Sequence, residues 1–114
     1  MIENMPINQL RSHLLTLHKA LVDETQKSYE ETHGTISNPH ALFRLLVEEP
    51  AFQWLRPLSE TIVSIDEALE TDPLASKQAI IGMVRDRLLP EQPTELSTNI
   101  QKHPLYKEIK DLLS

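Results

Sequence analysis

The chain has no cysteine and only two glycines in 114 residues. Without cysteine it can form no disulfide, no thiolate nucleophile and no thiolate metal site. Two isolated glycines, Gly34 and Gly82, cannot supply the glycine-rich loop that cradles phosphate groups, and neither a zinc pattern nor a nucleophile elbow is present. The common sequence signatures of an enzyme are therefore missing, and we assign no catalytic residue and no cofactor.

Positive charge is also scarce, because 11 Lys and Arg residues face 17 Asp and Glu residues, for a formal net charge of -6. Such a charge repels a nucleic-acid backbone or an anionic membrane on average. No apolar run is long enough to span a bilayer, and the opening Met1–Asn4 lacks the apolar core of a signal peptide. We expect a cytoplasmic protein without nucleic-acid or membrane partners.

The long segments are rich in Leu, Glu, Gln, Lys and Ala, which favour helix, and prolines stand beside capping residues at each break. We expect a first helix from Asn4–Pro6 to about Thr32, with Gly34 as its left-handed stop. Further helices are expected at 39–48, at 57–70, from Asp72–Pro73 to before Pro90, and at 104–113, with a turn at 96–101. The sequence predicts an all-α fold, an antiparallel helical bundle of four main helices plus a short extra helix.

We expect residues 1–114 to form a single domain, in which 92–114 is a C-terminal helical segment after a proline-rich linker. The first helix carries an apolar seam with spacings of three and four, typical of a helix packed along one side: Ile7, Leu10, Leu14, Leu17, Leu21 and Ser28. The helix at 57–70 has a matching stripe in Leu58, Ile62, Ile65 and Leu69. Gly82 interrupts a later helix, and we interpret it as a place where another backbone approaches closely.

His18 is the most informative polar residue, because it falls in the middle of the apolar arc of the first helix. A buried imidazole needs partners for both ring nitrogens, and Asp66 could supply one if the two helices are neighbours. His18 is then either a core residue that fixes helix register or a histidine oriented by a carboxylate, as a general base or ligand would be.

Asp66 also stands near the C-terminus of its helix, where the helix dipole disfavours negative charge. This position indicates a partner cation, for which Arg11, Lys19 and Arg56 are the candidates.

Three of the five aromatic residues, Phe43, Phe52 and Trp54, lie within twelve positions and lead into Trp54–Ser59. Trp54 and Arg56 are typical of a binding hot spot with a cation–π contact. The other interpretation makes Trp54 a core plug at a helix corner, with Arg56 bonded to the last carbonyls of the preceding helix.

Glu30 and His33 share one helix face, as in the Glu-x-x-His motifs of di-metal bundles. Such a centre needs two motifs and two further glutamates, and here there is one copy at a helix end. We therefore predict no metal site.

Four strings in fixed order carry a family resemblance: Leu17–Leu21 (LHKAL), Tyr29–Glu30, Trp54–Ser59 (WLRPLS) and Ile65–Leu69 (IDEAL). Over about residues 10–70 the chain resembles a family of small bacterial all-helical proteins with no established activity. The resemblance implies a bacterial, cytoplasmic, single-domain protein and assigns no functional residue.

Two hypotheses of function follow from these patterns. The first is a helical bundle that acts by association, as a homodimer or as a module that binds an unidentified protein partner. The alternative is a small-molecule-binding or catalytic bundle with an interior polar pocket around His18 and Asp66, lined also by Tyr29, Trp54 and Arg56.

Overall fold

The computed structural model of the protein describes residues 5–71 and 77–113. These segments contain seven helices and no strand: α1 (Met5–His33), α2 (Pro39–Glu48), α3 (Pro50–Gln53), α4 (Arg56–Thr71), α5 (Lys77–Leu88), α6 (Glu95–Lys102) and α7 (Tyr106–Leu113). The prediction of an all-α protein is confirmed for this part of the chain. The predicted Asp72–Pro73 cap lies outside the described residues. No described helix combines the length and apolar character needed to cross a membrane.

Capping residues set the ends of the first two helices as the sequence predicts. Gly34 adopts the left-handed conformation with φ 87° after the last turn of α1, and its N–H donates to the carbonyl of Glu30 over 3.0 Å. Asn38 caps α2, because its side-chain oxygen accepts from the Ala41 N–H over 2.8 Å. The short connection between these helices is therefore fixed at both ends.

The segment between Pro50 and Pro57 forms the one-turn helix α3 before α4 begins at Arg56. The side-chain amide of Gln53 donates to the carbonyls of Leu46 over 3.2 Å and Val47 over 2.9 Å. Gln53 thus binds the unpaired carbonyls at the end of α2, a role that the sequence interpretation gave to Arg56. Arg56 instead pairs with Glu60, with Nε to Oε1 at 3.2 Å.

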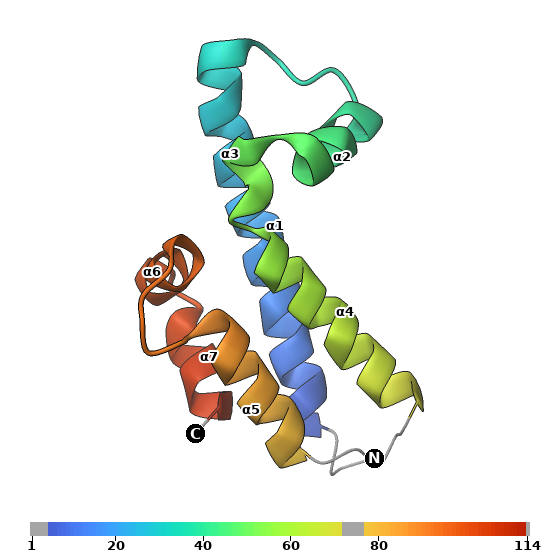
Figure 1. Ribbon diagram of the computed structural model, residues 1–114, viewed down its shortest axis with the longest axis vertical. Coiled ribbons are helices and arrows are strands. Elements are labelled where there is room, and N and C mark those ends of the chain that lie inside the picture. The colour runs from blue at the N-terminus through green and yellow to red at the C-terminus, as the bar shows by residue number, and fades with distance from the viewer. Residues whose placement is uncertain (1–4, 72–76, 114) are drawn as a thin grey trace.

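Helix α1 is the central element of the molecule. It packs against α3, α4 and α7, while α4 also packs on α5 and α7 contacts both α5 and α6. Helix α4 runs antiparallel beside α1, and α2 and α3 lie beside the upper part of α1 (Figure 1). The helices differ too much in length for a regular bundle, with 29 residues in α1 against 16 in α4 and 12 in α5.

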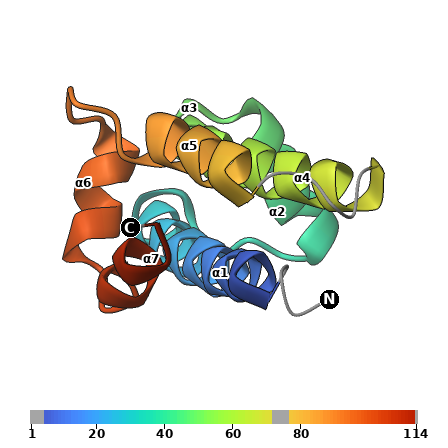
Figure 2. The same cartoon turned by 90° about the horizontal axis from the view of Figure 1, so that it is seen from below.

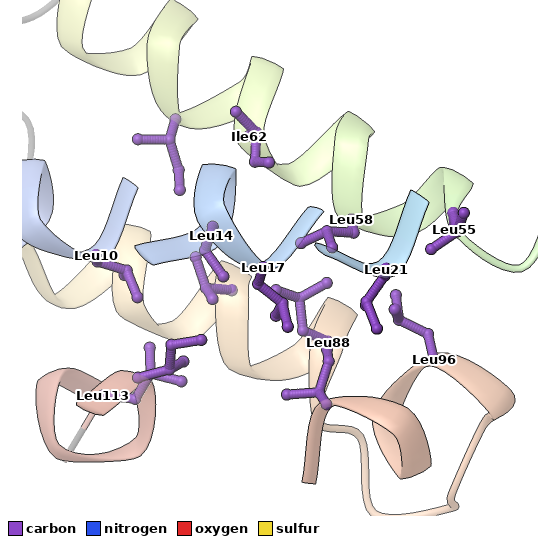
Figure 3. Packing of buried hydrophobic residues seen from close by; sticks show 14 of the residues in the cluster. Leu10, Leu14, Leu17, Leu21, Leu55, Leu58, Ile62, Leu88, Leu96 and Leu113 are labelled. Carbon is purple, nitrogen blue, oxygen red and sulfur yellow. The ribbon is translucent and has the colours of Figure 1, made fainter. Parts of the chain in front are cut away.

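The buried core follows the predicted seam of α1. Its five aliphatic positions from Ile7 to Leu21 are all at most 2% exposed. The side chains of Leu10, Leu14, Leu17 and Leu21 lie among those of α4, α5 and α7 in Figure 3. On α4, Leu58, Ile62 and Ile65 are buried as predicted, whereas Leu69 is partly buried. Ser28 is exposed, so its predicted place in the seam is wrong. The continuous core contact of α1 therefore ends near Val22, eleven residues before the helix does.

The molecule is elongated, with principal extents of 46 × 28 × 21 Å and a radius of gyration of 15.1 Å. A compact domain of this length has a radius of gyration of about 13 Å. The difference arises because the C-terminal part of α1 projects past α4, α5 and α7, with α2 and α3 beside it (Figure 1).

Gly82 in α5 has no close neighbour. A Cβ atom built on Gly82 meets no other atom within 4 Å, so the predicted close approach of another backbone is wrong. Gly34 likewise has open space, but its positive φ disfavours any side chain.

We expect Gly82→Ala to raise the free energy of unfolding by about 0.5–1 kcal/mol, because alanine restricts the unfolded chain and fits the helix without a clash. Chemical denaturation measures this change. Gly34→Ala is the matched control and should destabilise, since its backbone conformation is unfavourable for alanine. A loss of stability in Gly82→Ala would show that its helix face is covered.

Candidate functional site

Asp66 does not contact His18, so the predicted pairing of these two residues is wrong. The guanidinium of Arg11 forms an ion pair with the Asp66 carboxylate, through Nε to Oδ1 and through Nη2 to Oδ2 at 3.5 Å. This bond and the nearby negative charge raise the pKa of Arg11. His18 lies seven residues further along α1, roughly 10 Å away. Arg11 was one of the three predicted partner cations, and it is the one that binds.

Tyr29 and Trp54 lie in a different part of the molecule from Asp66. The Tyr29 ring stacks on His33 with centroids 4.1 Å apart and planes 8° apart, and it also contacts Phe52 at 5.5 Å. Tyr29 and Trp54 both line an open cleft of about 420 Å³ between α1, α3 and α6. Trp54 is partly buried against the core and has no cation–π contact with Arg56. This placement fits the core-plug interpretation of Trp54.

The five sequence-predicted site residues are therefore distributed over three places. His18 and Arg56 share one groove, Tyr29 and Trp54 share the cleft beside α6, and Asp66 is paired with Arg11. Within the described segments, neither the groove nor the cleft contains more than two of the five.

Glu30 and His33 serve the end of α1. The Glu30 carboxylate accepts from the Ile36 N–H over 2.6 Å, while the His33 ring stacks on Tyr29. Within residues 5–71 and 77–113, no three His, Asp or Glu side chains converge as metal ligands would.

A largely apolar groove lies between α1, α2 and α4, and we call it the α2 groove. It has a volume of about 330 Å³ and is lined by His18, Phe43, Leu46, Val47, Phe52, Leu55, Arg56 and Ser59. Helices α5 and α7 lie on one side of the α1–α4 pair, and α2 lies on the other, so the groove is on the side away from α5 (Figure 2). Its walls come from three helices and its floor from Phe52 and Leu55, which are both buried.

The apolar surface continues beyond the α2 groove along α1 and α4. Leu15 lies one turn from His18 on α1, and Val63 lies one turn from Ser59 on α4. Because the helices are antiparallel and Arg11 pairs with Asp66, the register places Leu15 opposite Val63. We call the α2 groove together with Leu15 and Val63 the apolar face.

This apolar face holds every large hydrophobic residue that is exposed in the described part of the chain. The exposed fractions are 41% for Leu15, 63% for Phe43, 51% for Val47 and 52% for Val63. Scattered exposed hydrophobics are common on soluble proteins, whereas their concentration on one face marks an interaction site.

Helix α2 has an apolar side but contains no buried residue. Leu42, Leu45 and Leu46 pack partly against the core, and Phe43 and Val47 project outward. A ten-residue helix is marginal without tertiary packing. The contacts within this chain thus leave much of the apolar surface of α2 uncovered.

Three ion pairs border the apolar face. Arg11 pairs with Asp66 at one end, Arg56 with Glu60 on α4, and Arg44 with Glu48 on α2 at 3.9 Å. His18 is the remaining titratable group that lines the α2 groove, and no residue in the described segments forms a hydrogen bond with its ring nitrogens. Burial lowers the pKa of the His18 imidazole.

In this region the sequence predicted His18 and Arg56 as site residues but not Leu15, Val47 and Val63. One available signal was the spacing of Phe43 and Val47, which puts two large apolar side chains on one side of a ten-residue helix. Leu15 and Val63 stand just outside the seams of their helices, so only the register between α1 and α4 brings them together.

Comparisons with protein-family models, with curated proteins and with solved structures find no match to this chain. The arrangement of the described residues is therefore the basis for assigning a function.

Because burial lowers the pKa of His18 below its usual 6.5, the unfolded chain takes up this proton more readily than the folded chain. The stability that neutral His18 allows in the folded chain is fully present above the pKa of this residue in the unfolded chain. It is lost as the pH falls below that value. We expect the free energy of unfolding to fall more steeply between about pH 7.5 and pH 5.5 in the wild type than in His18→Gln.

Urea denaturation at both pH values and one protein concentration measures this difference. His33→Gln, at an exposed site outside the apolar face, controls for the loss of an imidazole as such. Equal slopes in the wild type and in His18→Gln would contradict the assigned environment of His18.

Proposed function

We propose that this protein acts by protein association and that its partner is a second copy of the chain, docked on the apolar face. The observation that carries this proposal is the set of exposed hydrophobic residues on the apolar face: Phe43 and Val47 line the α2 groove, and Leu15 and Val63 lie one helical turn from its residues His18 and Ser59. A surface shared by two identical copies can be buried in one symmetric contact, which is the commonest form of soluble oligomer.

The apolar face can supply the apolar centre of a contact. Its four exposed hydrophobic residues present roughly 400 Å² of surface, within the range of about 300–600 Å² for the largest patch on a monomer. Burial of about 800 Å² in two copies contributes on the order of 20 kcal/mol before costs. Lost translational and rotational freedom costs about 4–15 kcal/mol, and side-chain ordering adds to this cost. Because about 800 Å² is less than the roughly 1,200–2,000 Å² of a standard interface, the contact must also bury the polar rim around these residues.

Charge supports a second copy as the occupant. The whole chain carries a formal charge of -6, which disfavours contact between two copies. Around the apolar face, however, each of Arg11, Arg44 and Arg56 is paired with a carboxylate, so these three ion pairs add no net charge to the local surface. Charges more than about 10 Å from the contact are largely screened at moderate salt.

A small-molecule-binding or catalytic function is the second hypothesis from the sequence, and the geometry supports it less. Its five proposed residues lie in three separate places. Asp66 is engaged by Arg11 and has no contact with the His18 ring.

Sedimentation equilibrium of the untagged wild type over a wide concentration range tests the proposal. We expect a dimer whose dissociation constant rises at least about tenfold in Phe43→Asp and in Val63→Asp, because each change buries an unpaired carboxylate in the contact. Both residues are exposed in the single chain, so circular dichroism should show an unchanged fold.

Gln78→Asp, at an exposed position on α5, adds the same negative charge outside the apolar face and should leave the dimer intact. A wild type that stays monomeric at all concentrations would overturn the proposed function. Equal weakening by all three substitutions would place the contact elsewhere.

A further inference from the structure

We infer that two copies dock reciprocally, with α2 of each copy packed on the α1–α4 surface of the other. This inference rests on the proposed function and specifies which parts of the apolar face meet. It follows from how the uncovered residues are divided between the two ends of that face.

The apolar face has two halves with different shapes. One half is the outer side of α2, a single helix that carries Phe43 and Val47. The other half is the surface between α1 and α4, where Leu15 and Val63 lie on two neighbouring helices. The side-chain ridges of one helix can pack against both members of a neighbouring helix pair at once, so the first half covers more of the second half than of another α2.

The number of uncovered residues also favours the reciprocal arrangement. If α2 packed on α2 of the other copy, Phe43 and Val47 would be covered while Leu15 and Val63 stayed in water. Reciprocal docking covers all four residues of both copies in one contact. Because each large aliphatic or aromatic side chain contributes about 1.5–3 kcal/mol when it is fully buried, covering two more residues in each copy decides between the arrangements.

Charge is compatible with this arrangement. The Arg44–Glu48 pair accompanies the α2 half, and the Arg11–Asp66 pair closes the α1–α4 half. Reciprocal docking therefore sets one ion pair near another.

A two-fold axis relates the two copies in this arrangement. Residues near the axis in one copy should contact the same residues in the other copy. His18 and Ser59 line the α2 groove at the boundary between the outer side of α2 and the Leu15–Val63 surface. Residues at this boundary lie close to the axis, so each should face the same residue of the second copy.

Cysteine cross-linking tests this geometry directly, because the full chain has no native cysteine. Val47→Cys and Val63→Cys are close in size to the native residues, and Cys packs as a small hydrophobic residue. We expect disulfides between Val47→Cys and Val63→Cys chains when the two are mixed, with one chain isotope-labelled so that the mixed product has an intermediate mass. Each of these variants alone should yield little cross-linked product.

Ser59→Cys, near the axis, should cross-link to itself. Ala51→Cys, exposed in the cleft beside α6, is the matched control and should stay monomeric under denaturing conditions. Efficient self-cross-linking of Val47→Cys without the mixed product would overturn reciprocal docking in favour of α2 against α2, while the dimer itself would stand. A wild type that sediments as a monomer would overturn the proposed function and this inference together.

Discussion

The structure depends on one physical constraint, the burial of the aliphatic seam of α1. From Ile7 to Leu21 this seam contacts the other long helices, and its side chains form the centre of the core. The seam stops near Val22 while the helix continues to His33, so the C-terminal part of α1 extends without a full set of neighbours. The elongated shape follows from this mismatch, as does the need for α2 and α3 to accompany the projecting part.

Helix α2 is held by hydrogen bonds at its ends and by partial packing of one side. Asn38 caps its start, Gln53 of α3 binds the carbonyls at its end, and Leu42, Leu45 and Leu46 pack partly against the core. These contacts do not require that the rest of its apolar surface be buried. As a result, Phe43 and Val47 remain on the surface, where exposure of apolar area is unfavourable unless another molecule covers it.

Helix ends and the main seam were predictable from the sequence because they depend on local chemistry. A left-handed Gly34, a capping Asn38 and a three-four spacing each act within a few residues. The predicted His18–Asp66 contact failed because it required the register between two helices, which a helical wheel does not contain. For the same reason the sequence did not indicate that Leu15 and Val63 lie opposite each other. No local pattern indicated that Gly82 faces open space.

The ion pair found in place of the predicted contact marks the register on which the apolar face depends. In the antiparallel register that the buried seams of α1 and α4 set, Arg11 meets Asp66, Leu15 lies opposite Val63, and His18 and Ser59 line one groove. Both members of the pair are partly exposed, so its contribution to stability is small and the burial of the seams decides the alignment. A shift of α4 by one turn would separate these side chains and divide the apolar surface. The polar pair therefore serves as the boundary of the face, and the uncharged residues beyond it are the ones left for association.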